Sequence, residues 1–203
     1  AFKGSYHGST HGSMSISYNE LKKTKYRPLV PGIRFISLNQ ERELEQITEA
    51  TAGVILETIQ GDAGVRIPDS SYLQALRARC NEVGALLVFD EIQCGLGRAG
   101  ANFAFEHFNV IPDVLTLGKS LGGGLPIGAL VTSTEHMAVF KENPMLGHIT
   151  TFGGHPVVCA SAAAFLKVLT TEIDYSILPK IAAIFHDVLI AHPEVKEIRN
   201  IGL

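Results

Sequence analysis

Short apolar runs alternate with helical patterns along the middle of this chain. The apolar residues dominate four runs, at positions 53–57, 85–89, 113–117 and 127–133. Between the first two runs, Leu73 and Leu76 lie at helical spacing, and Gly84 follows as a helix stop. Buried parallel strands have short apolar sequences and need helical crossovers between them. The pattern therefore predicts an α/β fold with three αβα layers and a mostly parallel sheet.

The segments outside this middle part follow other patterns. Residues 1–18 alternate Gly, Ser and His with single apolar positions and predict a loop, whereas residues 33–38 form a short β-rich run. Toward the C-terminus we expect a long, Ala-rich buried helix at residues 157–170. An amphipathic helix at 177–191 and a strand at 195–201 would follow it.

Polar residues stand where three of the apolar runs end, namely Glu57, Asp90 and Lys119. Ligands of open α/β sheets bind at the carboxyl ends of the strands, so these three groups suggest one shared pocket. Lys119 lies in a glycine-rich segment, and a partly desolvated lysine is a nucleophile toward carbonyl carbons. An unpaired buried carboxylate is costly, so Asp90 needs a partner. A protonated pyridine nitrogen, a helix terminus or a structural ion pair would each serve.

Composition narrows the functional class without identifying it. The 203 residues are 46% hydrophobic and 18% charged, with a net charge of −3, which is ordinary for a globular protein and gives no sign of nucleic-acid binding. No apolar run approaches the ~18–20 residues that a membrane span needs. The three cysteines are too scattered for a disulfide framework or a CxxC metal site, which fits the cytoplasm.

A histidine pair near the N-terminus is the one candidate for a metal site. His7 and His11 are four residues apart, as two zinc ligands on one helix would be. Gly8 and Gly12 argue against such a helix, and no Asp or Glu nearby completes a ligand set. We therefore expect no metal.

Two longer motifs carry a family resemblance. Residues 90–98 read DEIQCGLGR and residues 118–129 read GKSLGGGLPIGA. Together they resemble class III (subgroup II, fold type I) aminotransferases, the acetylornithine and ornithine aminotransferase family, which depend on pyridoxal 5′-phosphate (PLP). The resemblance implies that Lys119 is the Schiff-base lysine and that Asp90 faces the pyridine nitrogen. It also implies a PLP-binding large domain at residues 1–156, followed by a connecting helix and the start of a small α+β domain at 157–203.

The resemblance extends to further residues along the chain. It assigns Tyr6 to stacking on the cofactor ring, with His7 in the same loop, and Gln93 to the ring hydroxyl oxygen. Glu57 falls at an active-site carboxylate, although a structural acid at a strand end is an equally good interpretation. Thr151 matches a threonine that reaches the PLP phosphate of the neighbouring subunit, which implies a homodimer with shared active sites.

The chain departs from the family pattern at three positions. Thr58 stands where the family has Pro, Asp62 where it has Glu, and His155 where it has Asn. Asp is shorter than Glu by one methylene, so the substrate-facing role of that glutamate does not transfer directly to Asp62. The sequence offers no functional interpretation of His155.

The activity implied by the resemblance is a transamination. An amino group would move from an ω-amino donor, such as ornithine or N-acetylornithine, to a 2-oxo acid such as 2-oxoglutarate. The chain starts at Ala1 without an initiator Met, and the family's phosphate-cradling loop is not found in it. We therefore expect a fragment of a longer enzyme, one that binds PLP weakly and does not turn over by itself.

Three alternative functions compete with this interpretation. In a nucleotide hydrolase, the GKS sequence would end a P-loop, but the required Gly six residues before Lys119 is Asp113. An aminomutase or decarboxylase on the same fold remains open, and so does a truncated, non-catalytic remnant.

Overall fold

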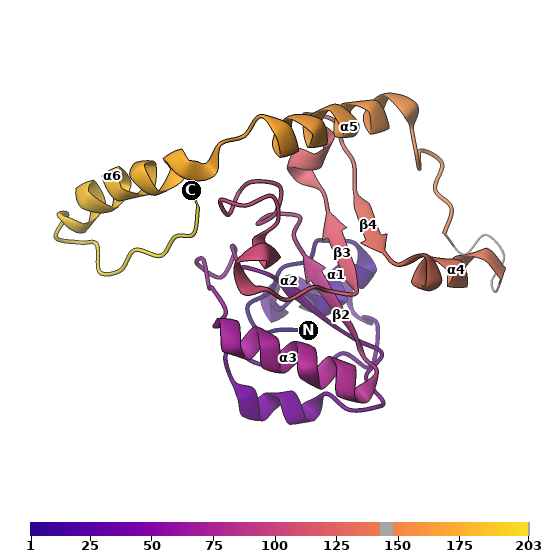
Figure 1. Ribbon diagram of the computed structural model, residues 1–203. Helices are drawn as coiled ribbons and strands as arrows, with labels where there is room; N and C mark the ends of the chain where they lie inside the picture. Colours follow the sequence, from indigo (N-terminus) through magenta and orange to yellow (C-terminus); the bar gives the residue numbers. More distant parts are fainter. Residues whose placement is uncertain (143–147, 203) are drawn as a thin grey trace.

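The four predicted strands form one sheet. The structure is a computed structural model that describes residues 1–142 and 148–202. Its strands are β1 (Gly53–Glu57), β2 (Leu86–Asp90), β3 (Val114–Leu117) and β4 (Ala129–Thr132), in that spatial order. The first three are parallel, and β4 runs antiparallel to β3 along the edge (Figure 1). The expectation of a mostly parallel sheet with flanking helices is confirmed.

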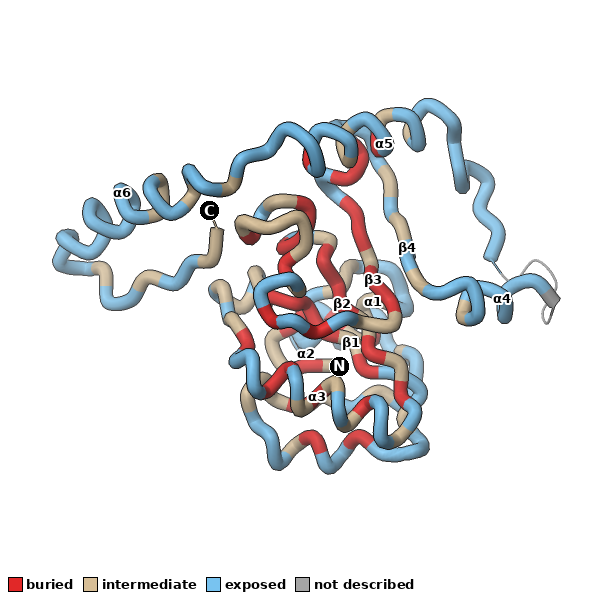
Figure 2. Tube along the Cα trace, in the orientation of Figure 1, coloured by how far each residue is buried: buried red, intermediate tan, exposed pale blue. Residues whose placement is uncertain are grey.

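Helix α3 (Ser70–Val83) crosses over from β1 to β2 and supplies one wall of the core. Its buried side chains are Tyr72, Leu73, Leu76 and Cys80. The helix ends at Gly84, whose φ of +73° lies in the left-handed region that favours glycine, as the sequence predicted. Figure 2 shows buried residues along the strands, on α3 and in the loops that surround them.

The remaining helices do not connect parallel strands of the sheet. They are α1 (His11–Ile16), α2 (Glu20–Lys23), α4 (Thr134–Glu142), α5 (Pro156–Thr171) and α6 (Leu178–Ile190). The 3₁₀ helices are η1 (Thr24–Tyr26), η2 (Glu41–Gln46), η3 (Ala104–Phe108), η4 (Lys119–Gly122) and η5 (Tyr175–Ile177).

Three local predictions were wrong. The N-terminal 18 residues are not all loop, because α1 forms within them. In the segment 33–38 only Ile36 pairs as a strand would, through one parallel bridge to Phe2. The segment 195–201 forms no strand, since a strand needs a hydrogen-bonded neighbour and no part of the described sheet pairs with it.

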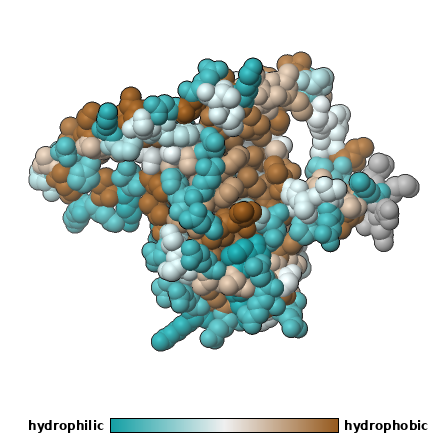
Figure 3. All heavy atoms as spheres, in the orientation of Figure 1, coloured by the Kyte–Doolittle hydropathy of each residue, from teal (hydrophilic) through white to brown (hydrophobic). Residues whose placement is uncertain are grey.

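The predicted burial of the C-terminal helix was also wrong. Helix α5 forms as predicted, yet only Ala162 and Leu169 are buried, and α6 buries no residue. Figure 1 shows why: α5 crosses one end of the sheet, while α6 extends beyond it. Figure 3 shows apolar residues at the surface of this region. The periodicity predicted the helices, whereas burial depends on what packs against them. The domain division at residue 156 stays a prediction.

Among the described residues, no single helix is long and apolar enough to cross a membrane. Helix α5 and the η5–α6 segment, bent by 62° at their junction, reach that length and hydropathy only when they are taken together.

Candidate active site

Two buried carboxylates lie side by side at one edge of the sheet. Glu57 ends β1 and Asp90 ends β2, and the strand register pairs the two residues directly. Both side chains are buried. The turn after β2 holds the Asp90 carboxylate, because the backbone N–H of Ile92 donates to its Oδ1 at 3.1 Å. The two carboxylates predicted at these strand ends are therefore brought together.

The N-terminal loop closes over both carboxylates. The backbone N–H of Tyr6 donates to Glu57 Oε1 at 2.7 Å, and His7 Nδ1 lies 2.7 Å from Asp90 Oδ2. The side chains of His7 and Asp90 are only 2% and 6% exposed. Tyr6 is 40% exposed, and the Nζ atom of Lys22 lies over its ring, 5.7 Å from the ring centre.

Burial changes the acidity of Glu57. The loss of solvation raises the pKa of its carboxyl group above the ordinary value. The Tyr6 N–H and the nearby His7 act in the opposite direction and offset part of that rise in the pKa. Glu57 therefore holds a proton at higher pH than a solvated glutamate does.

Gly118 separates Lys119 from the end of β3, and Lys119 is the first residue of the short helix η4. Its φ of +47° is left-handed, a strained conformation for a residue with a side chain and one that clusters at functional sites. The side chain is exposed, so the expected partial desolvation is absent from this chain. The lysine lines a cavity of about 420 Å³. Gln93 lines the same cavity.

Lys119 and Asp90 leave the sheet at the same edge. Asp90 pairs with Thr116 of β3, and Lys119 lies three residues further along that strand's path. The lysine cavity does not include Asp90 in its lining, so the predicted residues form two neighbouring groups. One group is the buried pair of Asp90 and Glu57 under the N-terminal loop, and the other is the open cavity of Lys119 and Gln93.

Thr151 belongs to neither group. It lies in an exposed segment that lines a separate cavity of about 650 Å³, together with residues 126–128 and the start of α5. Within this chain, therefore, Thr151 and Lys119 do not share a cavity.

A third buried carboxylate was missed by the sequence interpretation. Glu91 is fully buried and accepts hydrogen bonds from Thr58 Oγ1 at 2.9 Å and from the backbone N–H groups of Ala104 and Phe105 at 2.8 and 2.7 Å. It thereby ties the ends of β1 and β2 to η3, and its burial raises its pKa. The hydroxyl of Thr58, one of the departures from the family pattern, supplies one of these bonds. The available signal was a second acid directly after a buried strand.

The described residues contain neither a reactive cysteine in the lysine cavity nor a cluster of metal ligands. Cys94 lines the lysine cavity, but burial raises the pKa of its thiol to about 12, which leaves little thiolate at neutral pH. Across residues 1–142 and 148–202, no three His, Cys, Asp or Glu side chains gather as metal ligands would.

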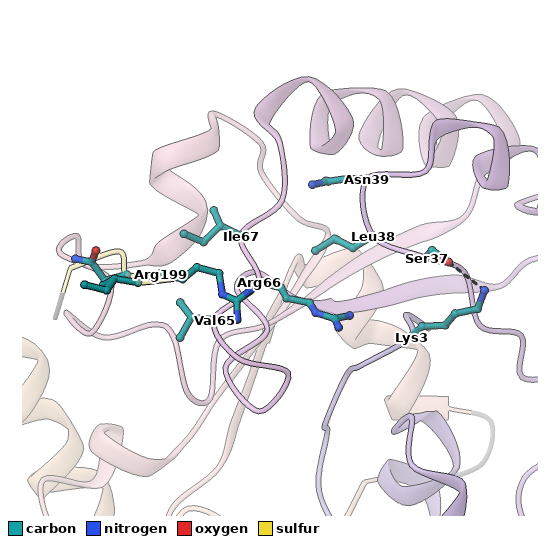
Figure 4. A pocket seen from close by; sticks show the side chains of 10 residues that line it. Lys3, Ser37, Leu38, Asn39, Val65, Arg66, Ile67 and Arg199 are labelled. Atoms are coloured by element: carbon teal, nitrogen blue, oxygen red, sulfur yellow. Dashed lines mark hydrogen bonds between the residues drawn. The ribbon is translucent and has the colours of Figure 1, made fainter. Parts of the chain in front are cut away.

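A polar groove of about 660 Å³ shares Val65 with the lining of the lysine cavity. Its cationic side chains are Lys3, Arg66 and Arg199, which Figure 4 shows spread along it. Lys3 Nζ donates to Ser37 Oγ and lies 3.8 Å from Glu43 Oε1, and Arg199 lies 3.1 Å from Glu197 Oε2. Much of this charge is thus already balanced, and none of the predicted site residues lines the groove.

Comparisons with known proteins agree with the motifs. The sequence pattern described as aminotransferase class-III matches residues 1–203. A putrescine aminotransferase from Pectobacterium atrosepticum is 43% identical over 180 residues, which are 85% of this chain and 38% of that protein. An acetylornithine aminotransferase from Methanocaldococcus jannaschii is 37% identical over 98% of this chain and 50% of its own length.

A solved structure shares the fold as well. The ornithine aminotransferase from Toxoplasma gondii, which has PLP at partial occupancy in its active site, superposes with a TM-score of 0.90 at 35% identity. The match covers all of this chain and 49% of that one. The chain spans about half the length of the proteins it matches, or less.

Proposed function

Because this chain belongs to the class III aminotransferases, we propose that the full protein transfers an amino group from an ω-amino donor to a 2-oxo acid. Enzymes of this family depend on PLP. The observation that carries the proposal is that two residues leave the sheet at one edge: Asp90, buried and held at both oxygens at the end of β2, and Lys119, an exposed amine two residues past the end of β3.

These residues fit the chemistry of PLP. When bound, PLP supplies an aldehyde that condenses with amines and a protonated ring that withdraws electrons from the substrate carbon. A buried carboxylate suits the ring nitrogen, because an ionised acid keeps that nitrogen protonated. An amine free of ion pairs suits the aldehyde, and no ion pair involves Lys119 within the described residues.

Each residue then has a distinct task in the proposed reaction. Lys119 would hold the cofactor through its Nζ atom, and the same amine would serve as the base that moves a proton. Asp90 keeps the ring nitrogen charged. The exposed ring of Tyr6 stacks on the cofactor, a contact worth about 1 kcal/mol beyond its burial. Gln93, in the lysine cavity, binds the ring hydroxyl oxygen, and Glu57 is the second active-site carboxylate.

Thr151 points to a homodimer. Its cavity is separate from that of Lys119, which supports a role in a second subunit's site rather than in its own. In the proposed dimer, each Thr151 binds the cofactor phosphate of the partner. We also propose that the enzyme acts in the cytoplasm.

The donor class follows from chemistry that the relatives have in common. Ornithine, N-acetylornithine and putrescine each carry a primary amine at the end of a short carbon chain, and relatives of this chain are named for all three. We propose that the full protein accepts a donor of this kind, with 2-oxoglutarate as the acceptor.

The Lys119→Ala substitution in the full-length protein tests the proposal. With these three amines and 2-oxoglutarate, we expect aldehyde formation to fall at least about a thousandfold, since the variant has neither the attaching amine nor the proton carrier. The near-420 nm absorbance band of the PLP-loaded protein should disappear as well. Lys25→Ala, which removes an exposed amine, should change neither measurement. Consumption of amine without any 2-oxo acid would instead indicate a decarboxylase or an aminomutase.

A further inference from the structure

Lys23, on the short helix α2, is the only buried lysine among the described residues. Its side chain is 4% exposed, and its Nζ atom lies 4.7 Å from the ring centre of Phe35. A lysine is rarely buried unless it is paired, because an unpaired ammonium in the interior is costly. The other groups around this ammonium therefore indicate its role.

The ammonium of Lys23 binds the C-terminal end of helix α1. It donates to the carbonyl oxygens of Ser15 at 3.3 Å and of Ser17 at 2.9 Å. The last carbonyl groups of a helix have no partner within the helix, and a cation at that end is favourable. Glu20 Oε1 lies 3.6 Å from the ammonium and balances its charge. Lys23 thus fastens the end of α1 to α2.

The end of α1 also holds the loop that carries Tyr6. Ser17 accepts hydrogen bonds at two atoms. Its carbonyl oxygen binds Lys23, and its Oγ binds the backbone N–H of His7 at 2.8 Å. The N–H of Tyr6 itself donates to Glu57 Oε1 at the edge of the sheet. A single serine therefore connects the buried ammonium to the loop that closes over the strand ends.

We propose that Lys23 is a positioning residue that acts through Tyr6. By holding the end of α1, it fixes the loop and so the orientation in which the Tyr6 ring meets the cofactor. This inference rests on the proposed function, in which that ring stacks on PLP, and adds a residue to it. Loss of the ammonium leaves the buried carbonyl groups of Ser15 and Ser17 without this donor, and the loop gains freedom that the Tyr6 ring shares.

Two substitutions separate the ammonium from the length of the side chain. In Lys23→Met, an unbranched side chain can still pack against Phe35 but donates no hydrogen bond. In Lys23→Arg, the positive charge and the donors remain. Lys25→Met makes the same change at an exposed lysine two residues later and is the matched control.

The first measurement is the affinity of the full-length protein for PLP in equilibrium dialysis. We expect Lys23→Met to weaken binding about fivefold, which is the affinity that one aromatic stacking contact provides. Lys23→Arg should stay within about twofold of the parent, and Lys25→Met should match the parent. A Lys23→Met protein with the parent's affinity would overturn the proposal, and so would a folded Lys23→Arg protein as impaired as Lys23→Met.

A double-mutant cycle tests whether Lys23 acts through Tyr6 or through general stability. Tyr6→Leu removes the stacking ring, so Lys23→Met should change PLP affinity by less than about 1.5-fold in that background. A residue that only stabilised the domain would weaken binding by the same factor in both backgrounds. Additive effects of the two substitutions would therefore contradict the proposal.

Amine labelling tests the buried contact in the parent protein and does not require any variant to fold. In the PLP-free full-length protein, mass spectrometry should show that acetic anhydride modifies Lys23 at least about tenfold more slowly than Lys25, because the reagent reaches a buried amine only through local opening. Equal labelling rates would overturn the proposal. If the parent protein binds no PLP, the proposed function fails instead, and the labelling still decides whether Lys23 anchors the end of α1.

Discussion

Helices α3 and α6 are nearly equal in length and differ in almost every other respect. The first has 14 residues and buries four of them, among them Leu76, which is 0% exposed. The second has 13 residues, is more apolar in sequence and buries none. Apolar residues therefore direct each segment to become a helix, but they do not determine what the helix packs against. Burial is a property of the surroundings.

The surroundings of α3 are strands that lie far away along the chain. Arg77 of the helix pairs at 2.8 Å with Asp113, whose same oxygen also accepts from the backbone N–H of Leu87 at the start of β2. One carboxylate thus fastens the helix to two neighbouring strands. Helix α6 packs mainly against η5, which precedes it directly in sequence. Among the described residues, no ion pair joins α6 to another element.

A matched pair of leucine-to-alanine substitutions, one on each helix, should give the largest difference in the free energy of unfolding. In the 203-residue chain, we expect Leu76→Ala to lower the free energy of unfolding by about 4 kcal/mol, since it leaves a cavity in the core. Leu189→Ala on α6 removes a side chain that is 44% exposed and should cost less than about 0.5 kcal/mol. Urea unfolding followed by circular dichroism measures both. Similar costs at the two sites would contradict the contrast and show that α6 is covered.

Loss of the buried hydrogen bonds of Glu91 should lower the free energy of unfolding by a smaller amount. We expect Glu91→Gln to cost about 2 kcal/mol, because an amide offers one acceptor oxygen to three donors and turns an N–H₂ group toward the others. Glu172→Gln, at an exposed acid that follows α5, should lie within about 0.5 kcal/mol of zero. The same unfolding measurement compares the two. Equal effects would mean that the Glu91 contacts contribute nothing specific.

The pH dependence of the Glu91 effect has a defined sign. Burial raises the pKa of Glu91 in the folded state, so the folded protein binds this proton more tightly than the unfolded chain. The stability that the acid contributes is therefore fully present below the ordinary glutamate pKa and is lost as the pH rises through the raised value. The cost of Glu91→Gln should then be larger near pH 4 than near pH 8. A cost that grows with pH would contradict the raised pKa.

The difference between local sequence signals and contacts between distant segments explains which features the sequence could predict. The parallel strands and α3 were predictable, because apolar runs and Gly84 are local signals for them. Asp90 and Glu57 were predictable as neighbours, since parallel strands end at one sheet edge. The bonds of Glu91 were not, because they depend on where η3 comes to lie, and the exposure of α5 was not, because it depends on what covers that helix.

The smallest of these effects compares two glycines that share one backbone conformation. Gly84 after α3 has a φ of +73°, Gly154 before α5 has a φ of +69°, and a Cβ atom would meet nothing within 4 Å at either position. Alanine should therefore be strained by a similar amount at both, about 1 kcal/mol. That strain lowers the free energy of unfolding only where the residue folds together with the core. We expect Gly84→Ala to cost about 1 kcal/mol in urea unfolding and Gly154→Ala less than about 0.3 kcal/mol, because the exposed segment can relax without disturbing the sheet. An equal cost at Gly154 would place the C-terminal helices in the same cooperative unit as the core, and the contrast between α3 and α6 would then be one of exposure alone.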